Sequence, residues 1–109
     1  MYKTNEKYIE DIITNIDFII EHTKGISKEE LEADPVLADS MSFRLIQISE
    51  ISKNLTEEFK EKHSDVPWTD IMALRNRLVH DYGNVDMSIV FDTLKKDIPE
   101  LRGELIKVL

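Results

Sequence analysis

Residues 9–20 read IEDIITNIDFII, and the spacing of their apolar side chains predicts the first element of the fold. Its isoleucines recur at steps of three and four residues, at Ile9, Ile12, Ile13, Ile16, Ile19 and Ile20. That spacing places them along one side of an α-helix and leaves the polar residues on the other side. We therefore predict a helix from about Thr4 to Thr23, with Gly25 as its C-terminal cap.

Further helices follow along the chain. Residues Ser27–Glu30 form the pattern of a capping box that opens a short helical turn. Asp34 and Pro35 start a second helix, which we expect to run to about Glu61. Ser52 interrupts its apolar stripe and is small enough to allow close packing. The residues expected to face inward are Leu37, Met41, Leu45, Ile48, Leu55 and Phe59.

The last third of the chain predicts two or three more helices. Pro67 opens a third helix that should end near Gly83-Asn84, two residues suited to left-handed backbone. Asp86 caps a fourth helix, and Pro99 either kinks the chain or starts a fifth helix. The apolar residues of this region are Ile89, Val90, Phe91, Leu94, Leu101, Leu105 and Val108. Strand signals are nearly absent, so we predict an all-α, antiparallel up-and-down helical bundle of four to five helices in one domain, residues 1–109.

Composition limits the classes of function. The chain has 109 residues, no cysteine and a net charge of −8. No apolar run approaches the ~20 residues of a transmembrane helix, and we expect a cytoplasmic protein with no membrane partner. The acidic charge argues against broad electrostatic binding to nucleic acid, and we expect no DNA partner. Any activity on RNA must therefore rest on a few cations gathered at one place or on the charge of a partner.

The third helix carries an unusual polar face. The core direction of this helix is set by Ile71, Leu74 and Leu78. On an ideal helix Arg75 and Tyr82 flank that direction, whereas Asn76 and His80 lie opposite it and are four residues apart. Arg75 and His80 are separated by about 140°. They can meet if the arginine stem sweeps round, or if a second copy of the helix completes the site across a two-fold axis.

Arginine and histidine suit the cleavage of RNA. Histidine moves protons near neutral pH, so His80 can activate a ribose 2′-hydroxyl or protonate the leaving oxygen. Arg75 presents a permanent forked cation that matches phosphate oxygens. That reaction needs no metal, and the scattered histidines His22, His63 and His80 predict neither a metal site nor a cofactor. The alternative without catalysis is that Arg75 and Asn76 are solvated surface residues and His80 is structural. Tyr82 would then pack in the core with its hydroxyl in contact with water.

The motif and its surroundings resemble a known family. Arg75, four residues, His80, one residue and Tyr82 form a pattern similar to the signature of HEPN-domain proteins, specifically the HepT-like toxins. Similar segments run through Ile48–Leu55, from Pro67 to the motif, and through Val85–Leu101, so the resemblance covers nearly the whole chain. It implies a metal-independent endoribonuclease that works as a homodimer, with the two motif helices meeting at a composite cleft.

The resemblance also implies roles for single residues. Arg75 and His80 match the catalytic positions, and Asn76 matches the polar position that would orient the histidine or the phosphate. It implies a partner as well, a minimal nucleotidyltransferase antitoxin of the MNT type, which would attach adenylyl groups from ATP to Tyr82 (AMPylation). Such a group would add charge and bulk beside Arg75 and block the place of the RNA phosphate.

Some positions depart from the family pattern. Ser49 and Ile51 stand where smaller residues are frequent, and Gly83-Asn84 replaces an aromatic–acidic pair. These changes bear on loop shape and partner fit more than on catalytic identity. Glu50 matches a recurrent acidic residue, to which we assign no chemical role.

Three other functions compete with the toxin ribonuclease. The first is a non-catalytic HEPN substrate-binding or dimerisation module that partners a nucleotidyltransferase, which the net charge of −8 favours. The second is a phosphotransfer bundle with a phosphorylated His80, although no lysine follows shortly after His80 to support a phosphohistidine. The third is a plain helical dimerisation domain with Trp68 and Met72 as interface anchors. The RNA target is not encoded in any recognisable motif, although single-stranded or looped RNA is the general expectation.

Overall fold

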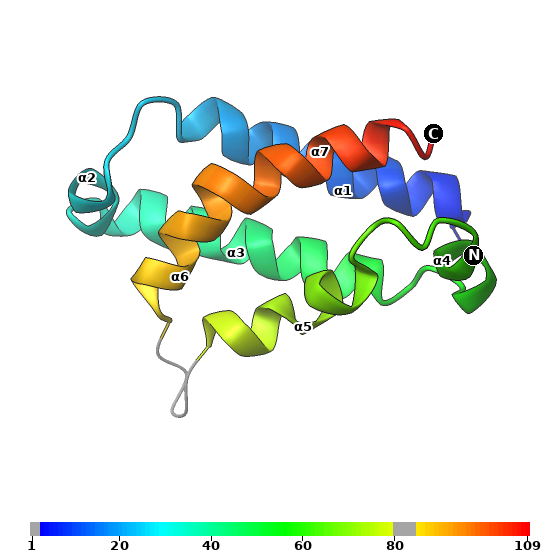
Figure 1. Cartoon of the computed structure of the whole chain (residues 1–109). Helices are drawn as coiled ribbons and strands as arrows, with labels where there is room; N and C mark the ends of the chain where they lie inside the picture. Colours follow the sequence, from blue (N-terminus) through cyan, green and yellow to red (C-terminus); the bar gives the residue numbers. More distant parts are fainter. Residues whose placement is uncertain (1–2, 80–84) are drawn as a thin grey trace.

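Four helical rods run alternately up and down in a computed structural model that describes residues 3–79 and 85–109 (Figure 1). The third rod, α5, packs against α3, and the last rod packs against α1. This arrangement confirms the predicted all-α bundle. The rods are α1 (Asn5–His22), α3 (Pro35–Ser52), α5 (Trp68–Leu78), and the continuous series α6 (Met87–Asp92), η2 (Thr93–Asp97) and α7 (Ile98–Ile106). Two short helices, α2 (Lys28–Glu32) and α4 (Glu57–Lys62), lie in the connections.

The isoleucine stripe of α1 forms the centre of the core, as its spacing predicts. Ile9, Ile12, Ile16 and Ile19 are almost completely buried, whereas Ile13 and Ile20 pack at the edge of the core. Ser52 is also fully buried, in line with the expectation of close packing at that point. The N-terminal caps are as predicted at Ser27 and Asp34. Thr23 is the C-terminal cap of α1, and Gly25 follows with a left-handed φ of +67°, so the cap predicted at Gly25 lies two residues earlier.

The second helix is shorter than predicted. It ends at Ser52 rather than Glu61, because the N–H groups of the next three residues donate to carbonyls three positions back and tighten the last turn. A new helix, α4, then begins after Thr56, whose hydroxyl accepts from the N–H of Phe59 at 3.2 Å. Asn5, at the start of α1, clamps this junction. Its side-chain oxygen accepts from the N–H of Thr56, and its amide donates to the Thr56 hydroxyl, both at 3.1 Å.

The third helix also ends earlier than predicted. It begins after Pro67 as expected but stops at Leu78, five residues before the predicted end at Gly83-Asn84. Val79 takes extended backbone and forms an isolated antiparallel bridge with Val85. The N–H of Asp86 donates to the carbonyl of Leu78 at 2.9 Å. β-Branched valines favour extended backbone, so this bridge competes with a further helical turn.

Pro99 starts α7 without breaking the last rod. Asp86 caps α6 as predicted, accepting from the N–H groups of Ser88 and Ile89. Because proline has no N–H to donate, the ladder widens before it into the π-helical turn η2, in which the N–H of Ile98 donates to the carbonyl of Thr93. The choice left open by the sequence, a kink or a new helix, is therefore resolved in favour of a helix start.

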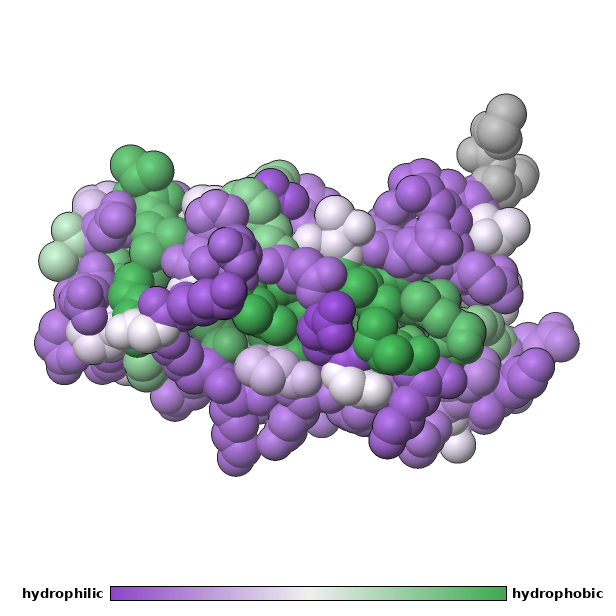
Figure 2. Space-filling view, turned by 90° about the horizontal axis from the view of Figure 1, so that it is seen from above, coloured by the Kyte–Doolittle hydropathy of each residue, from purple (hydrophilic) through white to green (hydrophobic). Residues whose placement is uncertain are grey.

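The face that carries α1 and α7 is mainly hydrophilic, with hydrophobic side chains showing between the polar borders (Figure 2). The large hydrophobic residues most exposed among those described are Val36, Phe43, Ile106 and Leu109. Within the described part of the chain, no helix combines the length and apolarity needed to cross a lipid bilayer.

Candidate functional site

The backbone around Arg75 is fixed to α3 by Ser49. The hydroxyl of Ser49 donates to the carbonyl of Met72 at 3.0 Å and accepts from the N–H of Arg75 at 3.4 Å. A second hydroxyl, on Ser52, donates to the carbonyl of Ser49 at 2.6 Å. Both serines are fully buried. The hydroxyl of Ser49 therefore holds the turn of α5 that presents Arg75.

The guanidinium of Arg75 is presented to solvent. Arg75 and its neighbour Asn76 are both exposed in the last turns of α5. The Nη1 atom of Arg75 donates to Oδ1 of Asn76 at 3.3 Å. Within the described residues no carboxylate lies in salt-bridge range of Arg75, and its other N–H groups remain free for an anionic ligand. The amide of Asn76 thus orients the cation rather than neutralising it.

The other predicted site residues, His80 and Tyr82, lie outside the described residues. The 140° predicted between Arg75 and His80 assumes a helix that continues to His80, whereas α5 ends at Leu78. The described residues of the motif end at Val79. Val79, which directly precedes His80, donates its N–H to the carbonyl of Arg75 at 3.1 Å.

Two residues predicted as interface anchors have other roles in the chain. Trp68 is only 6 % exposed, and its indole N–H donates to the carbonyl of His63 at 3.0 Å. Its ring also lies 6.3 Å from that of Phe59, so Trp68 belongs to the core and has little exposed surface for the interface that the dimerisation alternative assigns to it. Met72 is half-buried, and its sulfur accepts from the ammonium of Lys60 at 3.5 Å.

No metal cluster is present among the residues described. His22 bonds to the carbonyl of Phe18 at 2.8 Å and stacks on its ring, and His63 lies against Phe59. Within residues 3–79 and 85–109, no group of three or more histidine or carboxylate side chains is placed so that it could hold a metal ion.

The Ser49 contacts are the part of this site that sequence reasoning missed. The sequence identified Ser49 only as a departure from the family pattern. The available signal was the spacing of Ser42, Ser49 and Ser52, small polar residues on the inner side of an otherwise apolar helix.

Comparison with known proteins decides the family. The model of the family described as "Ribonuclease HepT-like" matches residues 12–108. The chain belongs to this family. The resemblance seen in the sequence is thereby confirmed, and membership of a family of ribonucleases confirms the predicted class of enzyme.

Relatives of this HepT-like chain come from bacteria and archaea. A protein of Caldanaerobacter subterraneus named "Putative RNase" is 43% identical over 98% of this chain and 96% of its own length. "Probable ribonuclease HepT" of Thermococcus cleftensis is 34% identical over 99% of this chain and 98% of its own. A longer protein of Methanocaldococcus jannaschii, named "Gamma-glutamylcyclotransferase and putative RNase", is 33% identical over all of this chain, which spans 49% of it. No solved structure matches the chain.

Proposed function

We propose that this HepT-like protein is the endoribonuclease toxin of a toxin–antitoxin pair, and that it cleaves RNA without a metal ion. The observation that carries the proposal is the presentation of Arg75. Its guanidinium is exposed and free of carboxylate partners in the described part of the chain, while its backbone is held by Ser49. A cation fixed in this way and desolvated by bound RNA would stabilise the negative charge of a transition state.

The proposed reaction is an internal transfer of the RNA phosphate. A neutral imidazole of His80 removes the proton from a ribose 2′-hydroxyl, and the 2′-oxygen forms a bond to phosphorus. The bond from phosphorus to the 5′-oxygen breaks, and that oxygen takes a proton from an imidazolium or from water. The products are a 2′,3′-cyclic phosphate and a free 5′-hydroxyl. Arg75 donates to the non-bridging oxygens, where charge develops, and Asn76 keeps the guanidinium in place.

A homodimer would complete the cleft. The C-terminal ends of two α5 helices brought together across a two-fold axis would place two copies of Arg75 and His80 around one RNA strand. One imidazole would then act as base and the other as acid. The two cations would also give an acidic protein the local positive charge that RNA binding needs.

A nucleotidyltransferase antitoxin would control this activity through Tyr82. The tyrosine oxygen would attack the α-phosphate of ATP, forming an oxygen–phosphorus bond while pyrophosphate leaves and the hydroxyl proton passes to a base. The attached adenylyl group would occupy the phosphate position beside Arg75. Incubation with an active MNT-type enzyme and ATP should add the mass of adenylyl groups to a peptide containing Tyr82. An unmodified peptide would contradict this part of the proposal.

A cleavage assay in a chelator tests the activity. Purified protein should degrade RNA in the presence of EDTA, and His80→Ala and Arg75→Ala should each lose about 10²-fold or more of the rate. Loss in both variants separates the protein's own activity from that of a contaminating nuclease. A protein that binds a nucleotidyltransferase but leaves RNA intact would instead support the non-catalytic HEPN module.

A further inference from the structure

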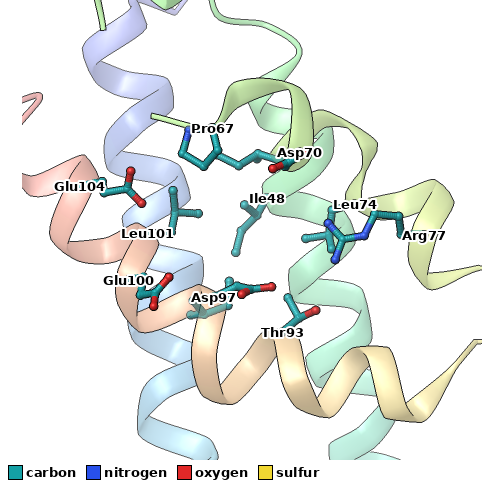
Figure 3. A pocket seen from close by; sticks show the side chains of 12 residues that line it. Ile48, Pro67, Asp70, Leu74, Arg77, Thr93, Asp97, Glu100, Leu101 and Glu104 are labelled. Atoms are coloured by element: carbon teal, nitrogen blue, oxygen red, sulfur yellow. The ribbon is translucent and has the colours of Figure 1, made fainter. Parts of the chain in front are cut away.

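A groove lies between α5 and the η2–α7 rod, with α3 beneath it (Figure 3). Its volume is about 220 Å³. The floor is apolar, and the residues that form it are Ile48, Ile71, Leu74, Ile98 and Leu101. These residues belong to the hydrophobic core, so the groove opens directly onto the interior packing of the bundle.

Carboxylates surround this floor on both walls. Asp70 stands on the α5 side, and Asp97, Glu100 and Glu104 stand on the η2–α7 side (Figure 3). Within the described part of the chain none of the four takes part in a salt bridge or a side-chain hydrogen bond. Among the described residues that line the groove, the one cation is Arg77. Four carboxylates against one guanidinium give the groove a negative field above an apolar surface.

The carboxylates on the walls and the apolar floor together determine which kind of molecule the groove can bind. RNA would be repelled by the carboxylates, and the same groove on a second copy of this chain would be repelled as well, because both carry four carboxylates against one guanidinium. A segment that carries lysine or arginine on either side of an apolar side chain satisfies both features, because long basic side chains reach polar groups while their stems cover apolar surface.

The size of the groove favours side chains over a free ligand. Small-molecule sites usually occupy about 300–1,000 Å³, and the groove volume of about 220 Å³ falls below that range. We propose that the groove docks a basic, amphipathic segment of a partner protein, with an apolar side chain on the floor and flanking cations on the carboxylates. This inference does not depend on the ribonuclease proposal.

The groove lies on the opposite flank of α5 from the proposed catalytic cation. Arg77 lines the groove, and two residues of a helix separate it from Arg75 by about 200°. A partner segment in the groove would therefore contact α5 while leaving the Arg75 face accessible. Docking and RNA cleavage are predicted to be separable functions.

A peptide-binding experiment tests the proposal on the full chain. The probe is a short fluorescent helical peptide with leucines on one face flanked by lysines, and a matched peptide carries serine in place of leucine. The groove variant is Glu100→Lys with Glu104→Lys, one helical turn apart on α7. The control is Glu6→Lys with Glu10→Lys, an equally spaced exposed pair on α1 that changes the net charge by the same amount.

We expect the groove variant to weaken binding of the leucine peptide by about tenfold or more while the control stays within about twofold, and we expect added salt to weaken the wild-type complex. RNA cleavage, assayed at moderate salt that screens the change in net charge, should be unchanged in both variants. Equal weakening in the two variants, or equal affinity for the serine peptide, would show that the groove acts only as a general acidic surface and would overturn the proposal.

Two further results would assign the groove to a different occupant. Displacement of the peptide by spermidine at similar concentration would assign the groove to small polycations, and self-association abolished by the groove variant would assign it to a second copy. Either result would also overturn the proposal.

Discussion

The hydroxyl of Ser49 joins α3 to α5 at the turn that carries Arg75. It satisfies the carbonyl of Met72 and the N–H of Arg75 in a place that solvent does not reach. Such a contact positions a functional side chain through its backbone and leaves the guanidinium free. Asn76 then limits the directions in which that guanidinium points.

Replacing Ser49 by alanine should destabilise the bundle. The change removes a buried donor and acceptor between two helices, and we expect the free energy of unfolding to fall by about 1–3 kcal/mol. Ser42→Ala is the matched control, because the hydroxyl of Ser42 is buried in the same helix but donates to Ala38 within that helix. Its loss should be smaller. Urea unfolding of both variants measures the difference, and equal losses would contradict the role assigned to Ser49.

Single residues differ in how far the sequence predicts them. The exposure of Asn76 follows from its angle opposite the core, and the structure confirms it, whereas Arg75, placed by its angle beside the core, is exposed as well. The Ser49 contact does not follow from periodicity, because it depends on which turns of two helices lie opposite each other. An arginine at the edge of a helix is predictable, whereas the group that holds it arises from packing.

Helix ends are controlled by short polar contacts at the scale of the element. Thr56 both caps α4 and joins it to Asn5 at the start of α1. The structure therefore has two helices where apolar spacing alone predicts one. The spacing of apolar residues indicates which face of a helix is buried, but an N-terminal cap such as Thr56 can begin a new helix while the apolar spacing continues.

Thr56→Ala should lower the free energy of unfolding by about 1–2 kcal/mol, because it removes a helix cap and a contact between two elements. Thr14→Ala is the control. The Thr14 hydroxyl is exposed and bonds only to Glu10 in its own helix among the described residues. Thermal unfolding compares the two variants. A Thr14→Ala control that loses as much stability as Thr56→Ala would contradict the role assigned to Thr56 at the start of α4.

The capping box at the start of α2 predicts that the free energy of unfolding depends on pH in the acid range. The N–H and hydroxyl of Ser27 hold the pKa of Glu30 below its usual 4.5. Because the pKa of Glu30 is lower in the folded state than in the unfolded state, the ionised carboxylate stabilises the fold at pH values above the unfolded-state pKa. This stabilisation is lost as the pH falls through the folded-state pKa. Glu30→Gln keeps an acceptor for Ser27 but removes the charge. The wild type should therefore lose more stability than Glu30→Gln between about pH 6 and pH 3. Chemical unfolding across that range measures both, and parallel curves would contradict the prediction.

The end of α5 illustrates a second limit of sequence reasoning. The helical pattern continues past Leu78, and Gly83-Asn84 is a plausible stop signal. The structure ends the helix earlier because Val79 pairs with Val85 across the connection. This bridge between residues six positions apart outweighs the local helix propensity. The motif residues His80 and Tyr82 lie directly after this point.

Charge dominates the behaviour expected of the whole molecule. With a net charge of −8, two copies repel each other at low ionic strength. Added salt screens this repulsion over about 10 Å at 0.1 M. If the proposed homodimer forms the RNA site, moderate salt should strengthen it, in contrast to the basic-peptide complex of the groove.

Analytical ultracentrifugation tests this prediction. The sedimentation coefficient should be that of a dimer, and the dissociation constant should fall as salt is raised from about 0.01 M to 0.1 M. Glu6→Lys with Glu10→Lys, which reduces the net charge, should dimerise more tightly at low salt. A monomer under all conditions would contradict the composite cleft.

The chemistry of the cleaved ends tests the central claim most directly. RNA cut in EDTA by the wild type should carry 2′,3′-cyclic phosphate and 5′-hydroxyl ends, as mass spectrometry of the fragments would show. Arg75→Ala should abolish those ends, and Arg77→Ala, which changes an exposed arginine on the other flank of the same helix, should leave them in place. Fragments with 5′-phosphate ends, or equal loss of cleavage in the two arginine variants, would contradict a site built on Arg75.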